Sequence, residues 1–278
     1  MKAYVISRGH APRMHTAAWL GKTGLDVTVV CDTLEEQKAI AAAMPYVRKS
    51  RIILTGTHGC LNARNFILSE LVHDGEWHIG IDDNVQHLDI VAPSLYVKPR
   101  LPVAGMPPRG HTWRSLYRHA IPPATLPRHL HYLRAQCVHH HTIYGGYAST
   151  ENPMFRANHF GYRRFVKTKL YVLQKTPGLQ FKGGDYAHDS WMSAYTVAEY
   201  GKVVVDNYIH PRYPWYEPGG LGKISERRAK LDVILDDIIA EFPGLVVKAK
   251  GANSALKFVR TSDAAVAKWR ATVGRDLL

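Results

Sequence analysis

The stretch HIGIDDNVQHL, residues 78–88, places a short apolar run directly before two carboxylates and a carboxamide, Asp82, Asp83 and Asn84. The apolar run is typical of a buried β-strand, so we expect the polar triplet to follow the end of a strand. Adjacent carboxylates repel each other, and a chain retains such a pair where a cation offsets the charge. The alternative is an ordinary turn without a ligand, because Asp and Asn are common turn residues.

Upstream of this stretch, β-like runs alternate with segments of helical spacing. The β-like runs cover residues 3–7, 26–31, 51–56 and 77–81, and the helical segments cover 10–24, 34–44 and 61–73. This alternation predicts a parallel sheet with helices on its faces. Ligands of such sheets bind beyond the carboxyl ends of the strands. The polar residues expected at those ends are Ser7, Arg8 and Gly9, then Asp32, then Asp82, Asp83 and Asn84.

The chain changes in composition after residue 92. Residues 93–135 are rich in Pro, Arg, His and aromatic residues, which predicts an insertion with short helices at 113–120 and 126–136. Further on, the patterns predict strands at 168–174 and 202–211, helices at 186–200 and 223–241, a hairpin, and a helix after Ser262. We therefore expect one domain over residues 1–221, with halves at 1–92 and 136–221 around the insertion, and a C-terminal extension over 222–278.

Composition narrows the class of protein. The 278 residues suit one large domain, and a formal net charge of +13 with a pI near 9.6 favours polyanionic partners. Three widely spaced cysteines argue against a disulfide framework or a thiolate zinc site. No apolar run reaches the roughly 18 to 20 residues that cross a bilayer, and no signal-peptide core is present. The expectation is a soluble, cytoplasmic protein without a membrane partner.

A longer segment, ARNFILSELVHDGEWHIGIDDN, residues 63–84, places an Ala-Arg-Asn helix start one helix and one strand before the acidic turn. In this spacing, and in the order of elements over residues 3–90, the chain resembles glycosyltransferases of the GT-A fold. The pairing of YVISRG, residues 4–9, with IDDN, residues 81–84, is similar to the phage TET-associated glycosyltransferases, which are thought to add sugars to hydroxymethylated cytosine in DNA. The resemblance implies a GT-A type, Rossmann-like α/β fold, in a host cytoplasm if the protein is phage-encoded.

The resemblance also implies roles for individual residues around a UDP-sugar donor and a divalent cation, Mn²⁺ or Mg²⁺. Asn84 stands where a DxD motif has its second acid, which favours Asp83 as the direct metal ligand. His210, in the position of a late metal-binding histidine, is the other candidate, although a solvated or core histidine is the ordinary alternative. The donor-binding residues implied are Ser7, Arg8, Gly9, Asp32, Arg64, Asn65 and Asp82, and the metal ligands implied are Asp83, Asp82 and His210.

A second acidic group follows in FKGGDYAHDSWMSAY, residues 181–195, where the GT-A order places the catalytic acid at a helix start. Either Asp185 or Asp189 can accept a proton from an acceptor hydroxyl. Asp185 can instead cap the helix, which favours Asp189 as the base.

Basic residues interleaved with aromatic ones suit a phosphate track with base stacking. Two segments have this composition, the insertion and residues 155–169, although a solvated basic surface would look the same. The residues expected to bind DNA or the acceptor are Arg114, Arg118, Arg156, Arg163, Arg164 and Lys167.

The sequence and the resemblance together predict a metal-dependent glycosyltransferase. We expect it to move a sugar from a UDP-sugar to the hydroxyl of 5-hydroxymethylcytosine in DNA with inversion, or with retention if no carboxylate reaches the acceptor. One alternative keeps the GT-A enzyme but gives it a glycan, protein or small-molecule acceptor. The other is a non-catalytic DNA-binding protein with a degenerate transferase fold.

Overall fold

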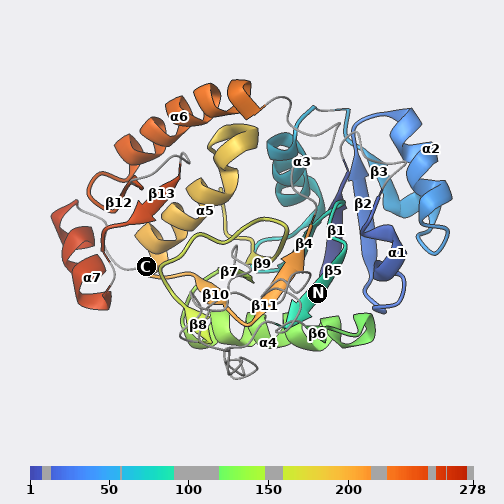
Figure 1. Ribbon diagram of the computed structural model, residues 1–278, viewed down its shortest axis with the longest axis horizontal. Coiled ribbons are helices and arrows are strands. Elements are labelled where there is room, and N and C mark those ends of the chain that lie inside the picture. Colours follow the sequence, from blue (N-terminus) through green and yellow to red (C-terminus); the bar gives the residue numbers. More distant parts are fainter. Residues whose placement is uncertain are drawn as a thin grey trace, which may run out of the picture.

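The computed structural model describes residues 1–7, 14–56, 58–90, 119–147, 159–213, 224–249, 255–260 and 262–273. Within these residues the protein is an α/β structure in which helices flank an eight-stranded mixed sheet (Figure 1). This confirms the predicted class of a mostly parallel sheet flanked by helices. In sheet order, the strands are β3 (Ile52–Leu54), β2 (Val27–Cys31), β1 (Lys2–Ile6), β4 (Trp77–Asp82), β9 (Leu170–Gln174), β7 (Tyr144–Tyr147), β10 (Val204–Asp206) and β8 (Phe160–Gly161).

The first four strands in this order run parallel to one another, as the alternating pattern predicts. β1 pairs in parallel with β2 and with β4, so Ile6 lies opposite both Val30 and Asp82. β9 runs antiparallel between β4 and β7. The amino end of β9 therefore lies at the same sheet edge as the carboxyl end of β4, where the amide of Asp82 donates to the carbonyl of Lys169 at 3.0 Å.

The two faces of the sheet carry different helices (Figure 1). Along β1, Ala3 and Val5 join the core beneath α1, α2 and α4, whereas Tyr4 and Ile6 pack beneath α3. Among the described residues no helix is both long and apolar enough to cross a membrane. The helices are α1 (Ala17–Leu20), α2 (Leu34–Ala43), α3 (Cys60–Phe66, continued by a π-helical turn at Ile67–Leu71), α4 (Leu126–His139) and α5 (Gly184–Tyr200).

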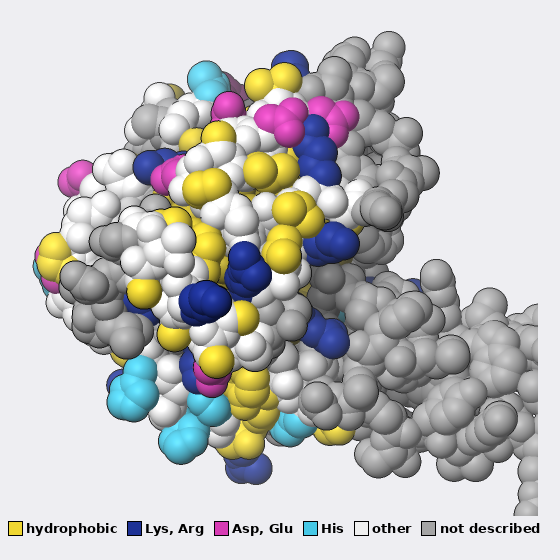
Figure 2. All heavy atoms as spheres, turned by 90° about the vertical axis from the view of Figure 1, so that its left-hand side faces the viewer, with side chains coloured by type: hydrophobic (Ala, Val, Ile, Leu, Met, Phe, Trp, Pro, Cys, Tyr) yellow, Lys and Arg dark blue, Asp and Glu magenta, His cyan; other side chains and the backbone are white. Residues whose placement is uncertain are grey.

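The C-terminal elements follow the predicted order of helix, hairpin and helix. They are α6 (Ile224–Glu241), β12 (Val246–Lys248), β13 (Leu256–Phe258) and α7 (Asp263–Thr272). Ile238 of α6 and Trp269 of α7 share one hydrophobic core with Trp191 of α5, and Figure 1 shows α6 lying over α5. The extension therefore completes the core on that face of the sheet. On the side of the molecule in Figure 2, Lys and Arg are spread among apolar side chains, the largest group of Asp and Glu lies at the top, and most of the His side chains lie toward the bottom.

Two glycines explain why the sequence did not predict β7. Glycine weakens strand propensity, so the run YGGY, residues 144–147, does not look like a strand. In the fold, a Cβ on Gly145 would lie 2.5 Å from Sγ of Cys137, and one on Gly146 would lie 2.3 Å from Cγ1 of Val166. These glycines let α4 and residue 166 approach the two faces of the strand.

Two other local predictions were wrong. The helix expected at 113–120 is described only at His119–Ala120, which form strand β6 in a second sheet of order β11-β5-β6. The strand expected at 202–211 divides into β10 and β11 (Ile209–Arg212), which belong to different sheets, and β5 (His87–Ile90) was not foreseen. The run of three histidines at 139–141 closes α4, because His139 is the last helical residue, His140 is the C-cap and His141 lies in a turn at φ 51°.

Candidate functional site

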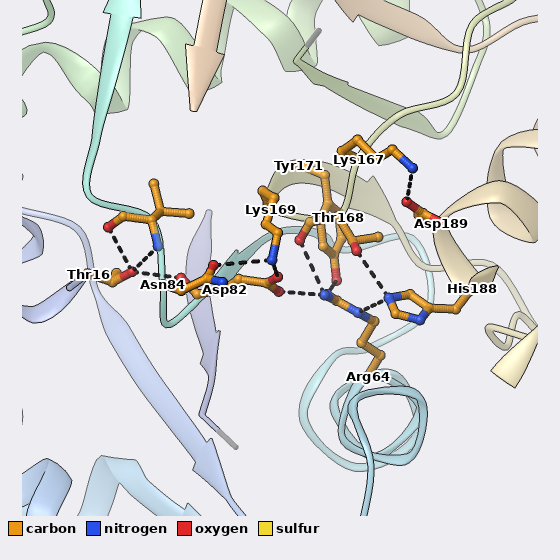
Figure 3. Close-up of polar contacts among 11 residues, drawn as sticks. Thr16, Arg64, Asp82, Asn84, Lys167, Thr168, Lys169, Tyr171, His188 and Asp189 are labelled. Atoms are coloured by element: carbon orange, nitrogen blue, oxygen red, sulfur yellow. Dashed lines mark hydrogen bonds and ion pairs between the residues drawn. The ribbon is translucent and has the colours of Figure 1, made fainter. Parts of the chain in front are cut away.

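The candidate site lies at the carboxyl edge of the parallel strands. The pairing of β1 with β2 and β4 brings the ends that precede Ser7, Asp32 and Asp83 to this edge, as the sequence predicts. Figure 3 shows Arg64, from α3, lying between Asp82 at the end of β4 and His188 from α5. The residues before and at the start of β9 complete the group.

Arg64 is the buried centre of this group, with only 1% of its surface exposed. Its Nη2 donates to Oδ1 of Asp82 at 2.7 Å and to the carbonyl of Thr168 at 3.2 Å, and its Nη1 donates to the Tyr171 hydroxyl at 3.1 Å. Its Nε donates to Nε2 of His188 at 3.0 Å. Burial opposes the charge, but Tyr171 and Asp82 outweigh burial and raise the pKa of Arg64 above its usual value. The guanidinium therefore stays charged, and these contacts hold it within the protein.

The contact with Arg64 fixes the protonation of His188. A guanidinium only donates hydrogen bonds, so Nε2 of His188 accepts, and the ring proton resides on Nδ1. That nitrogen lies 3.2 Å from the carbonyl of Gly184, which accepts its proton. Burial, assisted by the positive charge of Arg64, lowers the pKa of His188 to about 4. His188 is therefore neutral near pH 7. Sequence reasoning missed it, and its only signal was its place beside Asp189 at a helix start.

Asp82 is held by two cations. Its Oδ1 accepts from Arg64, and its Oδ2 lies 2.8 Å from Nζ of Lys169, which is also 3.2 Å from Oδ1 of Asn84. Burial raises the pKa of Asp82, but Lys169 and Arg64 outweigh burial and bring the pKa to about 2. The first and third side chains of the acidic turn thus share one ammonium group. Sequence reasoning had counted Lys169 only as one charge in a basic segment.

The backbone of the acidic turn is fixed from α1. The amide of Thr16 donates to the carbonyl of Asp83 at 3.0 Å, and its hydroxyl donates to the carbonyl of Asp82 at 2.7 Å. The same hydroxyl accepts from the amide of Val85 at 3.1 Å, while the indole of Trp19 donates to the Val85 carbonyl at 2.7 Å (Figure 3 shows the Thr16 contacts). The turn is therefore held in one conformation before any ligand binds.

The described residues do not assemble the expected metal ligands. Within the described ranges, no group of three or more His, Cys, Asp or Glu side chains is placed to hold a metal ion. His210 is buried on β11, paired with Asp89 of β5. Asp83 is also buried. Because both oxygens of Asp82 already contact cations, a divalent ion at Asp82 would compete with the Lys169 ammonium and be repelled by it. The surroundings of Asp82 therefore fit a divalent ion poorly.

The two candidate bases differ in their contacts. Oδ1 of Asp185 accepts from the amide of Leu61 at 2.8 Å, so Asp185 caps α3, whereas Gly183 is the N-cap residue of its own helix. Oδ2 of Asp189 lies 2.9 Å from Nζ of Lys167. Burial raises the pKa of Asp189, but Lys167 outweighs burial and leaves the pKa below its usual value. Asp189 is therefore an ionised carboxylate at the start of α5.

Three of the residues expected to bind the donor, Asn65, Asp32 and Ser7, are described by the structure but are not among the contacts of Arg64 given above. Asn65 joins α3 to the loop before α5, because its amide donates to the carbonyl of Phe181 at 3.0 Å and accepts from the Phe181 amide at 2.7 Å. Asp32 accepts from the Thr55 hydroxyl at 3.4 Å. The side chain of Ser7 is buried, and its hydroxyl has no hydrogen-bond partner within the described residues.

Of the described basic residues that were expected to bind DNA or the acceptor, one, Lys167, contacts a candidate catalytic residue. Arg163 forms an ion pair with Asp263 of α7, and Nη1 of Arg164 donates to Asn207 at 3.3 Å. Lys167 contacts Asp189, as described above. The predicted site residues that lie outside the described residues are Arg8, Gly9, Arg114, Arg118 and Arg156.

Comparisons of the chain with models of known protein families, with curated proteins and with solved structures each returned no match.

Proposed function

We propose that the protein is a glycosyltransferase of the GT-A type that binds a UDP-sugar at the carboxyl ends of β1, β2 and β4. One observation carries the proposal: a fixed acidic turn and the ends of two neighbouring parallel strands meet at one sheet edge, where Lys169 supplies a partly exposed positive charge. Open α/β sheets bind their ligands at this edge. The buried Ser7 hydroxyl at the end of β1 is a further polar group for the nucleotide.

Asp189 is the group we assign to the acceptor. In the reaction, the acceptor hydroxyl oxygen attacks the anomeric carbon, the bond from that carbon to the diphosphate oxygen breaks, and UDP leaves with the electron pair. The hydroxyl proton passes to Asp189, which is ionised and whose oxygens contact Lys167 and Ser190, whereas Asp185 caps α3. This is a direct displacement with inversion.

The divalent cation that the resemblance implies fits poorly at Asp82. A Mn²⁺ or Mg²⁺ ion would neutralise charge on the leaving diphosphate, but both oxygens of Asp82 are engaged by Arg64 and Lys169. The ion would have to compete with Lys169 for Asp82 or bind through Asp83, so no step of the proposed reaction is assigned to it.

We propose 5-hydroxymethylcytosine in DNA as the acceptor. The net charge of +13 supports a polyanionic partner, and Lys167 places a positive charge beside the proposed base. Lys and Arg contacts to phosphates would make binding depend strongly on salt. A glycan, protein or small-molecule acceptor would not require such a charge.

The test is nucleoside mass spectrometry of hydroxymethylcytosine DNA incubated with the protein and a panel of UDP-sugars, once in Mn²⁺ and once in EDTA. We expect a hexose-sized mass gain that is absent with unmodified cytosine DNA. Asp189→Asn should slow the gain by a factor on the order of 100 or more. Asp26→Asn is the matched control, because Asp26 is an exposed partner of Arg51 on the surface.

Two results would count against the proposal. If no donor gives a mass gain and UDP does not bind, the protein is not a UDP-sugar transferase. If sugar is transferred to a free nucleoside or a glycan but not to DNA, the transferase stands and the acceptor changes.

A further inference from the structure

Lys169 stands at the centre of the acidic turn. Its Nζ lies 2.8 Å from Oδ2 of Asp82 and 3.2 Å from Oδ1 of Asn84, the side chains at the first and third positions of the turn. Carboxylate and carboxamide oxygens are also the ligands that Mg²⁺ prefers. An ammonium group therefore binds the oxygens that a divalent cation would use.

The fold holds this lysine in place. The amide of Asp82 donates to the carbonyl of Lys169 at 3.0 Å, directly before β9 pairs with β4. The ring of Tyr213 lies 5.0 Å from Nζ, at a distance suited to a cation–π contact. The position of the ammonium therefore depends on the pairing of β4 with β9 and on the ring of Tyr213, which directly follows β11.

Lys169 differs from Arg64 in being open to a ligand. The side chain of Arg64 is 1% exposed, whereas that of Lys169 is 26% exposed. An ammonium has three donors; among the described residues Asp82 and Asn84 accept from two of them, and the third is the one that we assign to a ligand. Arg64 already provides a buried counter-ion for Asp82, so the second cation is not required to neutralise that carboxylate.

We propose that Lys169 is the cation that binds the diphosphate of the nucleotide at this site and that it takes the place of a divalent metal ion there. This inference rests on the proposed function. Lysine binds phosphate as a point charge. The Lys169 ammonium stabilises the negative charge that develops on the diphosphate when the bond to the sugar breaks.

The experiment is isothermal titration calorimetry of the full chain with UDP and with uridine, in EDTA and then in Mn²⁺. We expect UDP to bind in EDTA and Mn²⁺ to change its affinity by less than about threefold. Lys169→Met should weaken UDP binding by roughly 10- to 100-fold, as expected for one charge-assisted hydrogen bond, and should leave uridine binding unchanged. Lys169→Arg keeps the charge and should stay within about tenfold of the parent protein.

Lys182→Met is the matched control. Lys182 is exposed and pairs with Glu241, away from the acidic turn, so the change should leave UDP binding as it is. If Lys169→Met does not fold, Lys169→Gln removes the charge but keeps a donor for Asp82. The comparison of EDTA with Mn²⁺ needs no variant at all.

The outcomes separate this inference from the proposed function. UDP binding that requires Mn²⁺ would overturn the inference and leave a metal-dependent transferase. An equal loss of UDP and uridine binding in Lys169→Met would show that the lysine only supports the structure. The absence of binding by either compound in both buffers would overturn both the inference and the proposed function.

Discussion

Replacing Arg64 by methionine should destabilise the protein strongly. The methionine keeps most of the side-chain volume but removes the guanidinium, which is 1% exposed and makes hydrogen bonds to Asp82, Tyr171, His188 and the Thr168 carbonyl. Asp82 would then keep only Lys169, and the buried acceptors on His188 and Thr168 would lose a donor.

The magnitude follows from the loss of one partner of a buried ion pair. Removing one member costs about 3 to 5 kcal/mol when the remaining charge stays buried without a counter-ion, and because Lys169 still pairs with Asp82 we expect the lower end of that range. In a chain of this size, that loss lowers the melting temperature by on the order of 10 °C. Removing both charges, in Arg64→Met with Asp82→Asn, should cost less than the two single changes added together.

The assay is equilibrium unfolding in urea at pH 7. Arg51→Met is the matched control, because the Arg51 side chain is 42% exposed and its 3.3 Å ion pair with Asp26 lies on the surface. That change should cost less than about 1 kcal/mol. If Arg64→Met costs no more than Arg51→Met, the guanidinium is not the buried counter-ion of Asp82, and the reasoning about the site is wrong.

Three further predictions concern single residues of the site. The folded pKa of His188, about 4, lies below the usual 6.5, so its contribution to stability is complete above pH 6.5 and is lost as the pH falls toward 4. In urea unfolding, the wild-type protein should lose about 3 kcal/mol more stability than His188→Gln over that pH range, and equal losses would contradict the neutral buried ring. Gly80→Ala should cost roughly 3 kcal/mol in the same assay, because its Cβ would lie 2.1 Å from Cζ of Tyr171, and a loss below about 0.5 kcal/mol would contradict that packing. Asp185→Ala should lose about 1 kcal/mol as a missing cap, whereas Asp185→Asn should keep both stability and sugar transfer; a stable Asp185→Asn without transfer would make Asp185 the base in place of Asp189.

The order of the main elements could be predicted because their signals are local. The β-like run before Asp82 and the helical spacing before it recur in the folded protein as β4 and as α3 with its π-helical turn. β7 could not be predicted, because its Gly145 and Gly146 make room for Cys137 and Val166, and such packing depends on contacts that spacing does not reveal.

The site was only half visible in the sequence for the same reason. Asp82, Arg64 and Asp189 stood out by residue type and position. Lys169 is 87 residues from Asp82 and His188 is 124 residues from Arg64, so only the antiparallel insertion of β9 and the approach of α3 to α5 bring them together. The adjacent carboxylates predict a cation at the acidic turn. For Asp82, the cations are the side chains of Arg64 and Lys169.

The segment Lys167-Thr168-Lys169, ahead of β9, organises the charges of the site. Thr168 is buried, and its carbonyl accepts from Arg64 while its hydroxyl lies 3.1 Å from Nε2 of His188. The lysine before it pairs with Asp189, and the lysine after it pairs with Asp82 (Figure 3). One buried threonine thus fixes the spacing between two partly exposed ammonium groups. In the proposed reaction, Lys167 lies beside the base Asp189 and Lys169 lies beside the leaving diphosphate. Three consecutive residues would therefore set the distance between the base and the leaving group.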